Sequence, residues 1–168
     1  ELIEAGSQVL VGAFQEFYPD NWQEEMQKRV VVHVYDRIDG SLRQASSEAY
    51  TMEQSAARVV EAAMLARDKG IVNFSISGEA ATTASPEEAI QFYRYITAWL
   101  VNTGADSVNV NLANTYGFSP NEVWNAGTLT IFNEAIKHGL DDKVTTSIHA
   151  HNDVNSANDF TWSAIVAG

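Results

Sequence analysis

The sequence contains no cysteine, which excludes a disulfide framework and leaves the redox compartment open. It also lacks any apolar run near the about 20 residues that cross a bilayer, and its start does not resemble a signal peptide. Basic residues are few: 10 Lys and Arg against 22 Asp and Glu give a net charge of −12. Because nucleic acids and anionic membranes attract clustered basic faces, neither is expected as a partner, and a cytoplasmic protein is expected.

The composition is that of a folded protein. The chain has 168 residues, of which 45% are hydrophobic and 10% aromatic. This length is enough for one domain with a sizeable core, and this apolar content argues against disorder. We therefore predict a single domain over residues 1–168.

A pattern of apolar strand, polar loop, capped helix and glycine recurs about every 35 to 40 residues, as in a parallel sheet covered by helices. Strands are predicted at residues 7–14, 29–36, 71–77, 107–112 and from 144 into the two histidines that follow, and the continuous apolar character of the first two predicts that they are buried. Capping boxes predict helix starts at residues 51–54, 85–88 and 119–122. A last helix is predicted over residues 155–167.

Two architectures fit this repeat. A doubly wound sheet normally carries a glycine-rich G-x-G-x-x-G turn after its first strand, and none is present. In a (β/α)₈ barrel, function collects at the C-terminal ends of the strands. The polar residues of this chain stand there: His33, Tyr35, Glu79, Asn114, Thr115, His149 and His151. Since a complete barrel takes about 250 residues, we predict an incomplete TIM barrel of about five βα units.

The segment Ser147–Asp153 reads Ser-Ile-His-Ala-His-Asn-Asp and continues a predicted strand. Residues two apart in a strand point to the same side, so His149 and His151 can aim both imidazoles at one point. Imidazole is a common ligand of divalent metals, and Asn152–Asp153 could orient such ligands from behind. A bare His-x-His fits two hydrogen-bonded polar side chains on a half-buried strand equally well.

Four motifs, taken in their order along the chain, resemble those of a family that includes 2-isopropylmalate synthase, homocitrate and citramalate synthases and hydroxymethylglutaryl-CoA lyase. The resemblance is closest to 2-isopropylmalate synthase. The motifs are Val32–Tyr35 (VHVY), Phe74–Glu79 (FSISGE), Asn111–Thr115 (NLANT) and Ser147–Asp153 (SIHAHND). In addition, Gln8–Leu10 resembles the third barrel strand of that family. The resemblance implies that the chain carries strands three to seven of a (β/α)₈ barrel.

The resemblance also implies a reaction. Acetyl-CoA adds through its methyl carbon to the keto carbon of a 2-oxo acid, 3-methyl-2-oxobutanoate in leucine biosynthesis, and CoA is released. It implies a divalent metal, Zn, Mn or Mg, with His149 and His151 as ligands that hold it while it polarises the keto group. The implied partners are the 2-oxo acid and acetyl-CoA, and the implied assembly is a homodimer.

The resemblance assigns roles to four further residues. Thr115 matches a position whose hydroxyl binds the substrate carboxylate. His33 and Tyr35 match residues that face the 2-oxo acid. Glu79 matches an acidic residue that moves a proton near the acetyl group, and burial of this carboxyl would suit it to acid–base work.

Structural interpretations of the same residues stay open. Glu79 could cap the loop before Ser85, and Thr115 could be a turn hydroxyl. His33 and Tyr35 could be hydrogen-bonded core residues.

The chain also departs from the family pattern. Relatives commonly have a glycine soon after H-x-H-N-D, where Val154–Asn155 stand here. The family's aspartate ligand from the first strand and its asparagine ligand after the eighth are outside the match, so this chain alone is expected to bind metal weakly and not to turn over. Two alternatives remain: a related metal-dependent aldolase or lyase of the same barrel family, and a non-catalytic barrel fragment.

Overall fold

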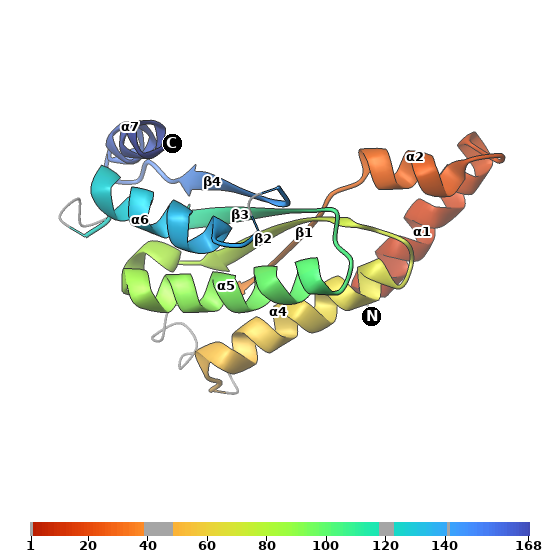
Figure 1. Ribbon diagram of the computed structural model, residues 1–168, viewed down its shortest axis with the longest axis horizontal. Coiled ribbons are helices and arrows are strands. Elements are labelled where there is room, and N and C mark those ends of the chain that lie inside the picture. Colours follow the sequence, from red (N-terminus) through yellow and green to blue (C-terminus); the bar gives the residue numbers. More distant parts are fainter. Residues whose placement is uncertain (1, 39–48, 118–122, 141) are drawn as a thin grey trace.

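The computed structural model describes residues 2–38, 49–117, 123–140 and 142–168, which form a parallel sheet with helices packed against it (Figure 1). The strands of this part lie in the order β1-β2-β3-β4. Their bounds are β1 Val32–Arg37, β2 Asn73–Glu79, β3 Ser107–Asn114 and β4 Val144–Ala150. The helices are α1 Leu2–Phe17, α2 Trp22–Arg29, α4 Met52–Arg67, α5 Pro86–Asn102, α6 Ala126–Lys137 and α7 Ala157–Ala167, with a short 3₁₀ turn at Ala81–Thr83. The predicted α/β class with parallel strands is confirmed.

The helix starts follow from local side-chain chemistry. The capping boxes predicted at residues 51–54 and 85–88 are both present, with each cap hydroxyl accepting the backbone N–H three residues on. The third predicted box, at 119–122, lies outside the described residues. Helix α6 begins after Asn125, whose side-chain oxygen accepts from the Thr128 backbone N–H at 3.1 Å.

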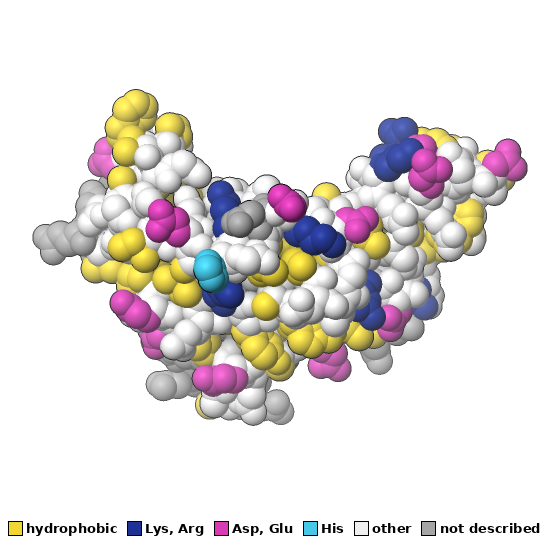
Figure 2. All heavy atoms as spheres, in the orientation of Figure 1, with side chains coloured by type: hydrophobic (Ala, Val, Ile, Leu, Met, Phe, Trp, Pro, Cys, Tyr) yellow, Lys and Arg dark blue, Asp and Glu magenta, His cyan; other side chains and the backbone are white. Residues whose placement is uncertain are grey.

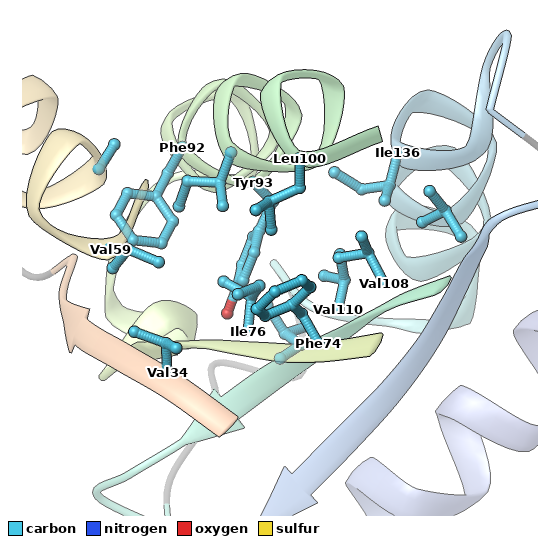
Figure 3. Close-up of a cluster of buried hydrophobic side chains, with 14 of the residues drawn as sticks. Val34, Val59, Phe74, Ile76, Phe92, Tyr93, Leu100, Val108, Val110 and Ile136 are labelled. Carbon is cyan, nitrogen blue, oxygen red and sulfur yellow. The ribbon is translucent and has the colours of Figure 1, made fainter. Parts of the chain in front are cut away.

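The hydrophobic core lies between the sheet and helices α4, α5 and α6 (Figure 3). Alternate strand residues point toward the helices because strand side chains alternate between the two faces. The core residues labelled in Figure 3 are Val34, Val59, Phe74, Ile76, Phe92, Tyr93, Leu100, Val108, Val110 and Ile136. Each large apolar side chain buried in this way stabilises the fold by roughly 1.5–3 kcal/mol.

Tyr93 joins helix α5 to two strands through its hydroxyl. The ring is fully buried, and the hydroxyl accepts from the Gly78 backbone N–H at 2.7 Å and donates to the Asn111 carbonyl at 2.8 Å. Gly78 leaves space for this contact, since a Cβ added there would stand 3.0 Å from the hydroxyl and 3.2 Å from Ile38. The Gly78 position therefore favours a residue without a side chain.

The strand predicted at residues 7–14 is wrong, because this segment is part of helix α1. Ser7 is buried, and Val11 and Phe14 pack against the core; these spacings of four and three place them on one helical face. Val9, in contrast, is exposed, so the run is not buried on both sides as a central strand would be. The described residues accordingly contribute four strands and not five to the sheet.

The molecule is hollowed between α7 at one end and α1 and α2 at the other (Figure 2). Helices α4, α5 and α6 lie along one side of the sheet, and in the part of the chain that is described no helix covers the other side (Figure 1). Within the same residues, every helix is too short or too polar to span a membrane. The uncovered side of the sheet holds the polar strand residues.

Candidate functional site

Small polar and histidine side chains fill the uncovered face of the sheet. They stand at alternate strand positions, between the residues that face the core, and the strand register aligns them in rows. One row is His33, Ser75, Asn109 and Thr145, and the next is Tyr35, Ser77, Asn111 and Ser147. The interior of a complete (β/α)₈ barrel is usually filled by branched apolar residues, so rows of hydrogen-bonding groups mark this face as a site for polar ligands.

Five of these residues form a continuous set of hydrogen bonds across all four strands, here called the polar chain. His33 Nε2 lies 2.7 Å from Ser77 Oγ, and Ser77 Oγ donates to Asn111 Oδ1 at 2.9 Å. Asn111 Nδ2 donates to Ser147 Oγ at 2.9 Å, and Ser147 Oγ donates to Asn109 Oδ1 at 2.8 Å. The histidine on β1 is thereby connected to strand β4.

Sequence reasoning missed the four polar-chain residues other than His33. A signal was present: polar residues alternate with apolar ones in two strands, at Asn73, Ser75 and Ser77 and at Ser107, Asn109 and Asn111. That alternation is typical of a sheet with one polar face, an inference that the strand predictions at 71–77 and 107–112 did not include. The register that connects these residues could not be read from either strand alone.

His33 and Tyr35 both lie on the uncovered face and not in the core. Their ring centroids are 5.9 Å apart, and Tyr35 is 66% exposed. Partial burial lowers the pKa of His33, and the nearby His149 lowers it further. His33 therefore favours the neutral imidazole, and the interpretation of this pair as core residues does not hold.

His149 and His151 lie side by side at the C-terminal end of β4. Their ring centroids are 4.9 Å apart and the rings are inclined by 30°. Asp153 Oδ2 stands 3.6 Å from His151 Nδ1 and can orient that ring, although Asp153 is largely exposed. Asn152, which was expected to act in the same way, accepts instead from the Ala157 backbone N–H at 3.3 Å, at the start of α7.

The imidazole pair fits part of a divalent-metal site. Catalytic zinc sites usually have three protein ligands, and structural ones have four. Within residues 2–38, 49–117, 123–140 and 142–168, no third His, Cys, Asp or Glu joins the pair in a group that could hold a metal ion. The described side chains thus supply two nitrogen ligands of suitable chemistry and do not complete the set.

Glu79 and Thr115 lie at the C-terminal ends of β2 and β3. Glu79 Oε2 is 3.4 Å from Arg37 Nε, and the Glu79 side chain is 36% exposed, less buried than its expected acid–base role assumed. Thr115 Oγ1 accepts from the Ala80 backbone N–H at 2.7 Å, in the turn after β2. Neither residue bonds to a histidine among the described side chains, so the structure does not join them to the polar chain.

The loop that follows the two histidines packs on the end of β3. Gly117 has φ +69°, and a Cβ added there would stand 2.8 Å from the Asp153 backbone nitrogen. Ser156 Oγ donates to the Gly117 carbonyl. Close approach of these backbones positions the loop that carries His151 and Asp153, and only glycine permits this approach without strain.

Comparison with known proteins supplies the family context. A protein-family model described as HMGL-like matches residues 24–168, a range that includes all four described strands and every predicted site residue. A search of curated proteins finds no match. HMGL-like domains are TIM barrels, so the match confirms the predicted incomplete (β/α)₈ barrel.

Proposed function

Because this chain belongs to the HMGL-like family, we propose that it catalyses a Claisen-type condensation of acetyl-CoA with a 2-oxo acid. The family consists of divalent-metal-dependent enzymes of aldolase, lyase and condensation type. The proposed 2-oxo acid is 3-methyl-2-oxobutanoate, which would make the chain a 2-isopropylmalate synthase of leucine biosynthesis. The match confirms the family resemblance expected from the sequence motifs. The observation that carries the proposal is the paired imidazoles of His149 and His151, 4.9 Å apart, on the same face as His33.

The reaction forms one carbon–carbon bond and breaks one thioester. The acetyl methyl group loses a proton, its carbon attacks the keto carbon, and the keto oxygen gains a proton to become a hydroxyl. Water then hydrolyses the thioester and gives a carboxylate and the CoA thiol. When bound by His149 and His151, a divalent ion such as Zn, Mn or Mg would supply Lewis-acid polarisation of the keto group.

Side chains of this face have proposed roles that match their contacts. Thr115 uses its oxygen to accept from Ala80, so its hydroxyl hydrogen is available to donate to the substrate carboxylate. Glu79 carries a carboxylate at the end of β2 that can move the methyl proton. His33 and Tyr35 face the 2-oxo acid, and Asp153 orients His151.

The test is release of free CoA thiol from acetyl-CoA, measured across a panel of 2-oxo acids with and without added divalent metal. The protein is used in the form in which cells make it. His149→Ala should lower release by at least about 10-fold to 100-fold, since loss of a metal ligand should cost at least as much as loss of a residue that only orients a ligand. His138→Ala is the matched control because His138 ends helix α6 and is a histidine outside the uncovered face.

The outcomes separate three functions. Metal-dependent release with one 2-oxo acid, lost in His149→Ala and kept in His138→Ala, supports the synthase. No release with any acid, from protein shown to be folded and metal-loaded, refutes it. Cleavage of a 3-hydroxy-acyl-CoA by the same protein would then indicate a lyase, and unchanged metal affinity in His149→Ala would indicate a non-catalytic barrel.

A further inference from the structure

The polar chain has a direction, and this direction constrains His33. A serine hydroxyl has one hydrogen to donate, and Ser77 gives that hydrogen to Asn111 Oδ1 at 2.9 Å. Asn111 cannot reverse its amide alone, because its Nδ2 donates to Ser147 Oγ at 2.9 Å. Ser147 in turn gives its hydrogen to Asn109 at 2.8 Å. Each donor points away from His33, so the orientation of one group depends on the next.

The position of the ring hydrogen on His33 follows from the direction of the Ser77 hydrogen bond. With its hydrogen used, Ser77 Oγ can only accept at the 2.7 Å contact with His33 Nε2. His33 must then carry its proton on Nε2. In the described part of the chain no group hydrogen-bonds to His33 Nδ1, which keeps its lone pair.

We propose that Ser77 and Asn111 are positioning residues that hold neutral His33 as the Nε2–H tautomer and leave its Nδ1 as a hydrogen-bond acceptor on the uncovered face. Ser77 is only 6% exposed, so water competes poorly for its hydroxyl. The lowered pKa of His33, which arises first from burial, agrees with a neutral ring.

A neutral His33 of this tautomer accepts from a ligand and does not donate to it. This consequence selects ligand groups that carry a hydrogen, such as a hydroxyl. If the proposed function holds, on which this step rests, the 2-oxo acid offers only acceptor oxygens to Nδ1. The hydroxyl that condensation creates from the keto oxygen is a donor, so His33 would bond the condensed product and not the starting acid.

The tautomer can be observed without any catalytic assay. Protein labelled with ¹⁵N histidine is studied by long-range ¹H–¹⁵N NMR, which distinguishes a protonated ring nitrogen from a bare one. Spectra are recorded well above the ordinary histidine pKa of about 6.5. His33→Gln identifies the His33 signals. In the unmodified protein we expect one dominant set, with Nε2 protonated and Nδ1 bare.

Substitutions along the polar chain give opposed expectations. Ser77→Ala removes the acceptor and should lower the ratio of Nε2–H to Nδ1–H tautomer roughly fivefold, the equivalent of one hydrogen bond of about 1 kcal/mol. Asn111→Leu frees the Ser77 hydrogen to donate to Nε2 and should move His33 toward Nδ1–H. Asn111→Asp keeps an acceptor for that hydrogen and should keep Nε2–H.

Ser75→Ala is the matched control, because Ser75 lies on the same strand face and donates to Asn109 at 3.3 Å, away from His33. It should leave the tautomer unchanged. An Nδ1–H ring in the unmodified protein would mean that the chain runs in the opposite sense, and it would overturn the proposal. Equal ratios of the two His33 tautomers in Asn111→Leu and Asn111→Asp would overturn the proposal as well. If Ser77→Ala does not fold, the comparison of these two Asn111 variants tests the proposal by itself. Failure of the CoA-release test would leave this result standing.

Discussion

Replacing Tyr93 by Phe should destabilise the fold by about 2 kcal/mol. The change keeps the buried ring and removes only the hydroxyl, which is the acceptor of the Gly78 N–H at 2.7 Å and the donor to the Asn111 carbonyl at 2.8 Å. A buried donor left without its partner costs roughly 1–3 kcal/mol, and a carbonyl with a second lone pair costs less. For a chain of this length, about 2 kcal/mol corresponds to a fall in the melting temperature of roughly 4–8 °C.

The assay compares urea and thermal unfolding, followed by circular dichroism, of the unmodified protein, Tyr93→Phe and Tyr95→Phe. Tyr95 is the matched control, since it lies in the same helix and is 52% exposed. Because about half of Tyr95 is exposed, removal of its hydroxyl should change the free energy of unfolding by less than about 0.5 kcal/mol. If the two variants lose the same free energy, or Tyr93→Phe loses less than about 0.5 kcal/mol, the inferred bond between α5 and the two strands does not stabilise the fold.

Three further predictions concern neighbouring positions. Burial raises the pKa of Tyr93, so the folded state keeps the phenol proton while the unfolded chain loses it above about pH 10. In urea melts over a pH series, the difference in unfolding free energy between the unmodified protein and Tyr93→Phe should therefore be constant below about pH 10. Above that pH the unmodified protein should lose stability relative to Tyr93→Phe. Gly78→Ala should destabilise the fold, because its Cβ would stand 3.0 Å from the Tyr93 hydroxyl, whereas Gly12→Ala in helix α1, with no atom within 4 Å, should be neutral or stabilising by up to about 1 kcal/mol in the same melts. Gly117→Ala should displace the Asp153 backbone and weaken binding of a divalent ion measured by calorimetry, and unchanged affinity would show that this packing does not position the histidines.

The helix starts illustrate what could be predicted from the sequence. In each confirmed capping box the two partners are three residues apart, so their bonds form whatever the rest of the chain does. The apolar run at residues 7–14 illustrates the limit. Its spacing fits a buried strand and one face of a helix alike, and packing of Val11 and Phe14 against the core selects the helix.

Part of the candidate site could likewise be predicted from local sequence, and part depended on the tertiary structure. Local sequence determined the two confirmed capping boxes and the His-x-His pair, because alternation within one strand already places His149 and His151 on one side. Tertiary structure decided the polar chain. Its successive bonds join residues far apart in the sequence: 44 positions from His33 to Ser77, 34 from Ser77 to Asn111 and 36 from Asn111 to Ser147. Such bonds depend on strand register, and register is set by the packing of the opposite, apolar face against the helices, which no single strand contains.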